Sequence, residues 1–162
     1  MPEVIVREYL PEDRAQIEKC IFELQEDEFA RRPHFWSNPE EVRGVYMDSV
    51  LKSIDSNNSK IFVGLIEGTV VAWMVVRAIT EDAQSPNIAL KSYGYIPELA
   101  VLREYKGRGV GKALMNKAEE FIKSKGLEWI ELDVSEGNGA LDFYSKSGYK
   151  PKSIRMEKKL DL

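Results

Sequence analysis

The sequence has only one cysteine, Cys20, and only one histidine, His34. A single cysteine excludes an internal disulfide, and one cysteine with one histidine is too few for a Cys/His zinc site. A Ser-His-Asp triad would have to use His34, which lies between Pro33 and Phe35 with no nucleophile motif nearby. We therefore expect no metal, and we expect Cys20 to be a small core residue.

Long apolar runs and an excess of positive charge are also missing. The longest apolar run, near residues 70–76, is far short of the roughly 20 residues that span a bilayer. The first residues show no basic start followed by an apolar stretch, which argues against a secretory signal. With 23 basic and 27 acidic residues the net charge is −4, which argues against a general nucleic-acid binder. We expect a cytoplasmic protein with no nucleic-acid or membrane partner.

What is present fits one globular α/β domain. The chain has 162 residues, of which 43% are hydrophobic, so we expect a single domain over residues 1–162. Apolar periodicity and turn residues predict the element order β-α-α-β-β-β-α-β-α-β. The predicted strands are 4–8, 60–67, 69–78, 92–102, 127–134 and 153–160, and the predicted helices are 11–30, 39–54, 110–125 and 138–147.

Two local signals within this order are specific. Glu67-Gly68 joins two β-branched runs and predicts a hairpin. Pro97 lies inside a predicted strand, and because proline cannot donate to a sheet ladder it predicts an edge, a bulge or a splay there. The polar stretch 79–91 is expected to be a longer excursion between strands.

A glycine-rich turn between a strand and a helix predicts an anion site. Gly107, Gly109 and Gly111 let the backbone approach a ligand closely, and the helix that follows offers its free N–H groups and positive dipole end. Lys106 and Lys112 add positive charge. The segment fails the Walker A pattern, and it fails the dinucleotide fingerprint because residue 112 is not glycine.

Two segments resemble the GNAT superfamily of N-acetyltransferases. Lys106-Gly-Arg-Gly109-Val-Gly111 is similar to the family's acyl-CoA signature Arg/Gln-x-x-Gly-x-Gly/Ala, with Lys106 in the Arg/Gln position. The segment from Ala140 to Tyr149 is similar to the later pattern Ala-x-x-x-Tyr-x-x-x-Gly-Phe/Tyr. The resemblance covers residues 93–151, the implied acyl-CoA-binding core. It implies a mixed, mostly antiparallel twisted sheet, flanked by about four helices, with a splay between strands 93–102 and 128–134.

The resemblance implies acetyl-CoA as cosubstrate, bound at that splay. The backbone around Ala100 would hold the pantetheine arm, and the glycine turn would hold the pyrophosphate. The family often has an asparagine seven residues before the tyrosine; here Asn138 is six before Tyr144, as in a loop one residue shorter. The implied cofactor-binding residues are Leu99, Ala100, Val101, Lys106, Gly107, Arg108, Gly109, Val110, Gly111, Lys112, Asn138 and Tyr144.

The implied reaction is direct attack of a primary amine on the thioester in a ternary complex. Tyr144 lies where the family keeps its general acid, and packing is the alternative role. Glu98 and Asp133 are the candidate bases, and water alone is a third possibility. The oxyanion donor is expected to be a backbone N–H near Val101.

The acceptor is predicted only by chemical class, a small cationic amine or a peptide amine. Phe35, Trp36 and Tyr46 follow the first helix and are candidates for the acceptor pocket, whereas Glu26-Asp27-Glu28 is interpreted as a solvated helix face. The family resemblance makes a homodimer an expectation. The alternative function is a non-catalytic acyl-CoA-binding regulatory module. A nucleotide-binding protein of another class is disfavoured by the two failed motifs.

Overall fold

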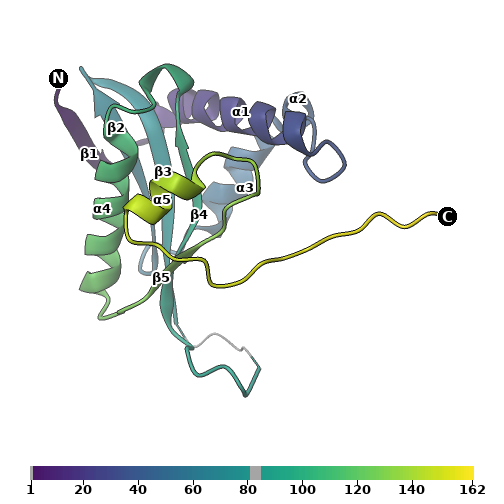
Figure 1. Cartoon of the computed structure of the whole chain (residues 1–162). Helices are drawn as coiled ribbons and strands as arrows, with labels where there is room; N and C mark the ends of the chain where they lie inside the picture. The colour runs from purple at the N-terminus through teal and green to yellow at the C-terminus, as the bar shows by residue number, and fades with distance from the viewer. Residues whose placement is uncertain (1, 81–84) are drawn as a thin grey trace.

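The computed structural model describes residues 2–80 and 85–162 and contains a five-stranded sheet in the order β1-β2-β3-β4-β5 (Figure 1). The first four strands are antiparallel to their neighbours, whereas β5 runs parallel to β4. This confirms the predicted mixed, mostly antiparallel sheet. The strands are β1 (Val4–Glu8), β2 (Ser59–Ile66), β3 (Thr69–Ile79), β4 (Tyr93–Val101) and β5 (Ile130–Leu132).

Helices cover both faces of the sheet. In Figure 1, α4 lies in front of the strands, and α1 and α3 lie behind them. None of the described helices is both long and apolar enough to cross a lipid bilayer. The helices are α1 (Arg14–Arg31), α2 (Pro39–Val42), α3 (Val45–Ser53), α4 (Val110–Ser124) and α5 (Leu141–Lys146), with short 3-10 turns at Pro11–Asp13 and Arg103–Tyr105.

The core is centred on β3, whose residues 70–76 are all buried. The β2–β3 turn has positive φ at Glu67 and Gly68, as a tight hairpin with primed-turn geometry requires, and this confirms the predicted hairpin. Helix α4 packs very closely on the sheet. A Cβ built on Gly94 would lie 2.5 Å from Ile122, so only glycine lets the helix approach β4 this far.

The structure corrects three sequence expectations. The helix predicted over 39–54 is two helices, because Gly44 adopts a φ of +76° between them. The strand predicted over 127–134 is confined to β5, and the helix predicted from residue 138 begins at Leu141. Residues 81–84 of the expected 79–91 excursion lie outside the described part of the chain.

The strand predicted over residues 153–160 is wrong for this structure. Residues 150–162 form neither helix nor strand and run away from the sheet (Figure 1). An alternating pattern gives a segment the character of a strand, but a strand forms only where another strand offers hydrogen bonds, and no described strand lies beside this one.

Candidate active site

The centre of the candidate site is a gap between β4 and β5. The two strands pair from Gly94 with Ile130 to Ile96 with Leu132, and then the pairing ends although β4 continues. The β3–β4 register shifts at the same point, so that β4 bulges at Pro97. Because Pro97 has no N–H to donate, the ladder breaks there. The predicted splay is confirmed.

The register of β4 directs two residues' backbone groups into this gap. Leu102 donates its N–H to the carbonyl oxygen of Val71 at 2.9 Å, which makes it a hydrogen-bonded partner of β3. Hydrogen-bonding direction alternates along an antiparallel strand, so the backbone of Ala100 also faces β3. Leu99 and Val101 therefore turn their N–H and C=O groups toward the open edge. Such groups can hold an extended, amide-containing ligand as an added strand would.

The glycine turn leads directly into the start of α4. Gly107 and Gly109 both have left-handed backbone, with φ of +78° and +82°, and α4 begins at the next residue, Val110. A Cβ built on either glycine meets no atom within 4 Å, so the turn is open to a ligand. The exposed side chains of Lys106, Arg108 and Lys112 surround it. The free N–H groups of a 15-residue helix and three cations suit a pyrophosphate.

Helix α5 is held against this turn by a close contact. A Cβ built on Gly111 would lie 3.3 Å from the Phe143 ring and 3.8 Å from the Val101 side chain. Glycine at 111 therefore lets Phe143 pack between the start of α4 and the end of β4. The neighbouring Tyr144 ring lies edge-on to Phe143, with centroids 5.1 Å apart. This packing fixes α5 near the end of β4, and Tyr144 is the residue of α5 that follows Phe143.

Burial raises the pKa of the Tyr144 hydroxyl from 10 to about 12. The hydroxyl therefore keeps its proton at neutral pH, which is the state that a general acid needs. Tyr149 also packs edge-on against the Tyr144 ring, with centroids 6.0 Å apart. The packing role and the acid role of Tyr144 are thus compatible, because the ring is fixed while the hydroxyl stays protonated.

Glu98 lies one residue after the bulge and accepts a hydrogen bond from the Tyr46 hydroxyl of α3. Burial, aided by the negative charge of Glu28, raises the pKa of Glu98 from 4.5 to about 8. Burial likewise raises the pKa of Glu28. A carboxyl group with a pKa near 8 can take up a proton at neutral to mildly basic pH.

The burial of Glu28 differs from the sequence interpretation of Glu26-Asp27-Glu28 as a solvated helix face. Glu26 and Asp27 are bound by Arg103 at 3.0 and 2.8 Å, whereas Glu28 is partly buried and its charge helps to raise the pKa of Glu98. The sequence holds a signal for this. Residues 17, 21, 24 and 28 recur at helical spacing, so Glu28 falls on the apolar face of α1.

The other predicted residues occupy more peripheral positions. Asp133 is exposed and accepts a hydrogen bond of 2.8 Å from the Tyr95 hydroxyl, at the edge of the gap. The Asn138 side-chain oxygen accepts from the N–H of Ala140 at 3.0 Å, which shapes the loop that leads into α5. Among the described residues, no group of three or more His, Cys, Asp or Glu side chains is arranged to hold a metal ion.

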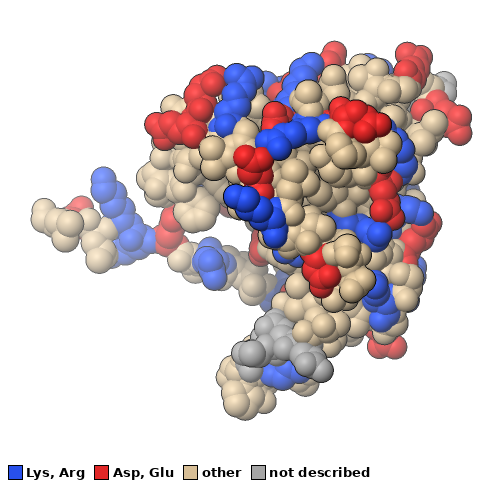
Figure 2. Space-filling view, turned by 180° about the vertical axis from the view of Figure 1, so that it is seen from behind, with Lys and Arg blue, Asp and Glu red and all other residues tan. Residues whose placement is uncertain are grey.

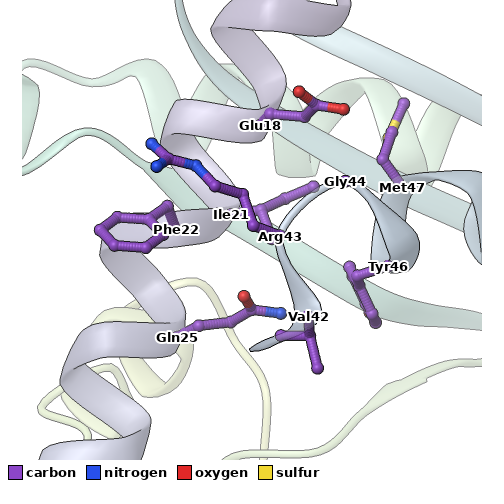
Figure 3. Close-up of a pocket in the computed structure, with 9 residues that line it drawn as sticks. All are labelled: Glu18, Ile21, Phe22, Gln25, Val42, Arg43, Gly44, Tyr46 and Met47. Carbon is purple, nitrogen blue, oxygen red and sulfur yellow. The ribbon is translucent and has the colours of Figure 1, made fainter. Parts of the chain in front are cut away.

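The aromatic candidates lie at the far end of α1. Phe35 is 64% exposed and stacks edge-on with Trp36 at 4.9 Å in the loop between α1 and α2. A small pocket opens between α1 and the bend that joins α2 to α3, where Arg43 lies over the Phe22 ring (Figure 3). Tyr46 borders this pocket with its ring directed away from Phe22. Its hydroxyl joins this region to Glu98.

Parts of the sequence are similar to known N-acetyltransferases. The chain is 39% identical over 69 residues to an uncharacterized N-acetyltransferase of Methanocaldococcus jannaschii, which is 42% of this chain and 30% of the relative. It is 39% identical over 57 residues to the ribosomal protein–alanine N-acetyltransferase of Haemophilus influenzae, 35% of this chain and 39% of that one. The chain thus spans well under half the length of these two relatives.

Likeness in structure extends much further along the chain. A crystal structure of a mutant protein from Bacillus halodurans superposes with a TM-score of 0.87 and 22% identity, covering 96% of this chain and 99% of the other. At that identity the likeness shows a shared fold. The sequence model of the acetyltransferase (GNAT) family matches residues 17–149. The chain therefore belongs to the GNAT family of acetyltransferases.

Proposed function

We propose that this protein is an N-acetyltransferase that moves an acetyl group from acetyl-CoA to a primary amine within a ternary complex. One observation carries the proposal. Beyond the point where β4 parts from β5, strand β4 carries in Glu98 a buried carboxyl group that can accept a proton, and helix α5 carries in Tyr144 a buried phenol that keeps its own. Amide formation by direct attack needs both.

The residues that face the gap fit acetyl-CoA. Leu99 and Val101 would hold the amide-containing arm with their backbone groups, and Gly107–Lys112 would hold the pyrophosphate. Asn138 would contribute from the loop before α5. Bound there, acetyl-CoA supplies a thioester carbonyl that an amine can attack. Residues of the chain then have to take a proton from the attacking amine and give a proton to the departing thiolate.

Three groups of the chain carry out proton transfer and charge stabilisation. Glu98 takes a proton from the ammonium of the acceptor, because burial gives it a pKa that permits uptake near neutral pH. The N–H of Val101 faces the gap and would stabilise negative charge on the carbonyl oxygen. Tyr144 gives its proton to the departing thiolate. Asp133 is the second candidate base, from its position beside Tyr95.

The surroundings of Glu98 favour a cationic acceptor. Glu28 acts electrostatically on Glu98, so two acidic groups share this region, and the loop after α1 offers aromatic surface at Phe35 and Trp36. Acidic and aromatic groups together favour a protonated amine. The Haemophilus relative is named for acetylating an alanine of a ribosomal protein, which supports a peptide amine as one acceptor class beside a small cationic amine.

The activity is tested by following release of free CoA thiol from acetyl-CoA over a panel of amines. The panel should include a peptide with N-terminal alanine, the same peptide with a blocked N-terminus, and a polyamine. We expect release that depends on a free amine and yields its acetyl amide. Tight binding of acetyl-CoA with no amine-dependent release across the panel would favour the alternative, a regulatory acyl-CoA-binding module.

The pH profile tests the role of Glu98. The carboxylate is the active form of a base and Glu98 has a pKa of about 8, so kcat/KM should rise with pH through about 8. In Glu98→Gln the rise of kcat/KM near pH 8 should disappear, with a loss of kcat/KM of roughly 10²–10⁴-fold at neutral pH.

The raised pKa of Glu98 must also affect the stability of the fold. The folded state keeps a proton that the unfolded chain releases, so stability should fall as the pH rises from 4.5 to about 8.

Asp133→Asn is the matched control, because it makes the same chemical change at the other candidate base. If Glu98→Gln keeps the limb near pH 8 and Asp133→Asn loses it, then Asp133 is the base. A limb that survives both substitutions would assign the proton transfer to water.

A further inference from the structure

A hydrogen bond between distant parts of the chain holds the side chain of Glu98. Tyr46 is the second residue of α3, and its hydroxyl donates to Oε1 of Glu98 on β4, 52 residues later. Among the described residues, no other group donates to either oxygen of this carboxyl group. The bond therefore engages one carboxyl oxygen and leaves the other, Oε2, for an acceptor.

The Tyr46 hydroxyl has a fixed position because α3 is anchored at both ends. The ring of Tyr46 packs against the hydrophobic core. Near the start of the helix, Asp48 forms an ion pair of 2.8 Å with Arg14 of α1. At its end, Arg77 of β3 donates to the backbone carbonyl and the hydroxyl of Ser53 at 3.3 and 2.7 Å. Helix α3 thus presents the phenol to Glu98 from a support tied to both α1 and the sheet.

Two further elements act on Glu98. Glu28 of α1 acts on it with a negative charge, and Val75 of β3, which is its register partner, is fully buried and apolar. Both neighbours disfavour the charged carboxylate. The phenol of Tyr46 acts in the opposite direction, because a donated hydrogen bond stabilises a carboxylate more than a neutral carboxyl group.

The remaining charged groups of this region do not change that balance. The other phenol and carboxyl group at the gap bind each other, since Tyr95 donates to Asp133 at 2.8 Å. Figure 2 views the side of the molecule that α1 and α3 cover, and there acidic and basic side chains are interspersed. Because a surface of mixed sign produces no strong field of one sign, the protonation of Glu98 depends on its immediate neighbours.

We propose that Tyr46 is a positioning residue, which holds the carboxyl group of Glu98 toward the acceptor and favours its proton-accepting form. The inference rests on the proposed function, because Tyr46 acts through the proposed base. While Tyr46 binds Oε1, Oε2 takes a proton from the acceptor ammonium. The N–H bond breaks, an O–H bond forms, and the electron pair stays on the nitrogen that attacks the thioester. Tyr46 keeps its own proton throughout.

The first test is the pH profile of Tyr46→Phe. Loss of the donated hydrogen bond should raise the pKa of Glu98 above its value of about 8, so the rise of kcat/KM should move upward by about one pH unit. At neutral pH kcat/KM should then fall by about tenfold. Above both pKa values it should return close to that of the parent. Titration of the acceptor amine is common to both proteins and cancels in the comparison.

Tyr9→Phe is the matched control for this substitution. Tyr9 is also partly buried and packs against the core, and it lies just after β1. Its hydroxyl has no part in the proposed reaction, so we expect a parental pH profile. If Tyr46→Phe lowers kcat/KM by the same factor at every pH, the role of Tyr46 is structural and the proposal is wrong.

A double variant tests whether Tyr46 acts through Glu98. In the background of Glu98→Gln, the change Tyr46→Phe should alter kcat/KM by less than about twofold, because the group on which it acts is already gone. A residue that contacts the acceptor directly would instead raise the acceptor KM by the same factor in both backgrounds. That result would overturn the proposal.

A measurement that needs no activity separates this inference from the proposed function. The side-chain carboxyl carbon of Glu98 can be followed by carbon-13 NMR and assigned by its absence in Glu98→Gln. Its titration midpoint should lie higher in Tyr46→Phe than in the parent and in Tyr9→Phe. An unchanged midpoint would overturn the role of Tyr46. A raised midpoint in a protein that acetylates no amine would support the action of Tyr46 on Glu98 and overturn the proposed function.

Discussion

Replacing Tyr144 by phenylalanine should lower kcat by roughly 10²–10⁴-fold, the range for loss of a positioned proton donor. Affinity for CoA should stay within a few-fold of the parent. The ring of Tyr144 packs between Phe143 and Tyr149, and phenylalanine preserves both contacts. Only the hydroxyl is removed, and its raised pKa of about 12 keeps it protonated at neutral pH. Steady-state rates at saturating acetyl-CoA, with calorimetric titration of CoA, measure the two effects separately.

The matched control for this substitution is Tyr149→Phe. It removes a hydroxyl from the adjacent ring of the same aromatic cluster, so any general effect on packing should be similar. We expect Tyr149→Phe to keep most of the turnover. If Tyr144→Phe turns over at the parental rate, Tyr144 has a packing role alone and the leaving thiolate is protonated by another group or by water.

The second large effect is expected from Gly109→Val, which should abolish CoA binding, with affinity reduced by at least about 100-fold. Gly109 has a left-handed φ of +82° at the start of α4, and a Cβ there would project into the open space where we propose that the pyrophosphate binds. A branched side chain would both strain this turn and block the approach of a phosphate to the helix N–H groups. Calorimetric titration of CoA measures the loss.

Gly126→Val separates the effect of backbone strain from the effect of blocked access to the helix N–H groups. Gly126 ends the same helix with a φ of +73°, and a Cβ built there also meets nothing within 4 Å. Both variants should lose similar stability, of the order of 1–2 kcal/mol for left-handed backbone. Only Gly109→Val should lose the ability to bind CoA. Parental CoA affinity in folded Gly109→Val would show that the pyrophosphate is bound elsewhere.

The local elements of the fold could be predicted because their causes are local. The Glu67-Gly68 hairpin follows from the backbone that a two-residue turn needs, and Pro97 marks the break in β4 because it lacks an N–H. The glycine turn before α4 is likewise specified by glycines whose φ is positive. Each of these signals lies within a few residues of the feature that it produces, so no long-range contact is needed to infer it.

Contacts between distant segments could not be predicted in this way. Nothing near Glu98 in the sequence indicates that Tyr46, 52 residues earlier, donates to it, or that Glu28 raises its pKa. The hairpin, the glycine turn before α4 and the break in β4 all follow from the sequence alone. The tertiary structure was needed to show which carboxyl group is buried and that residues 150–162 pair with none of the described strands. Burial and strand pairing depend on what the rest of the molecule brings alongside.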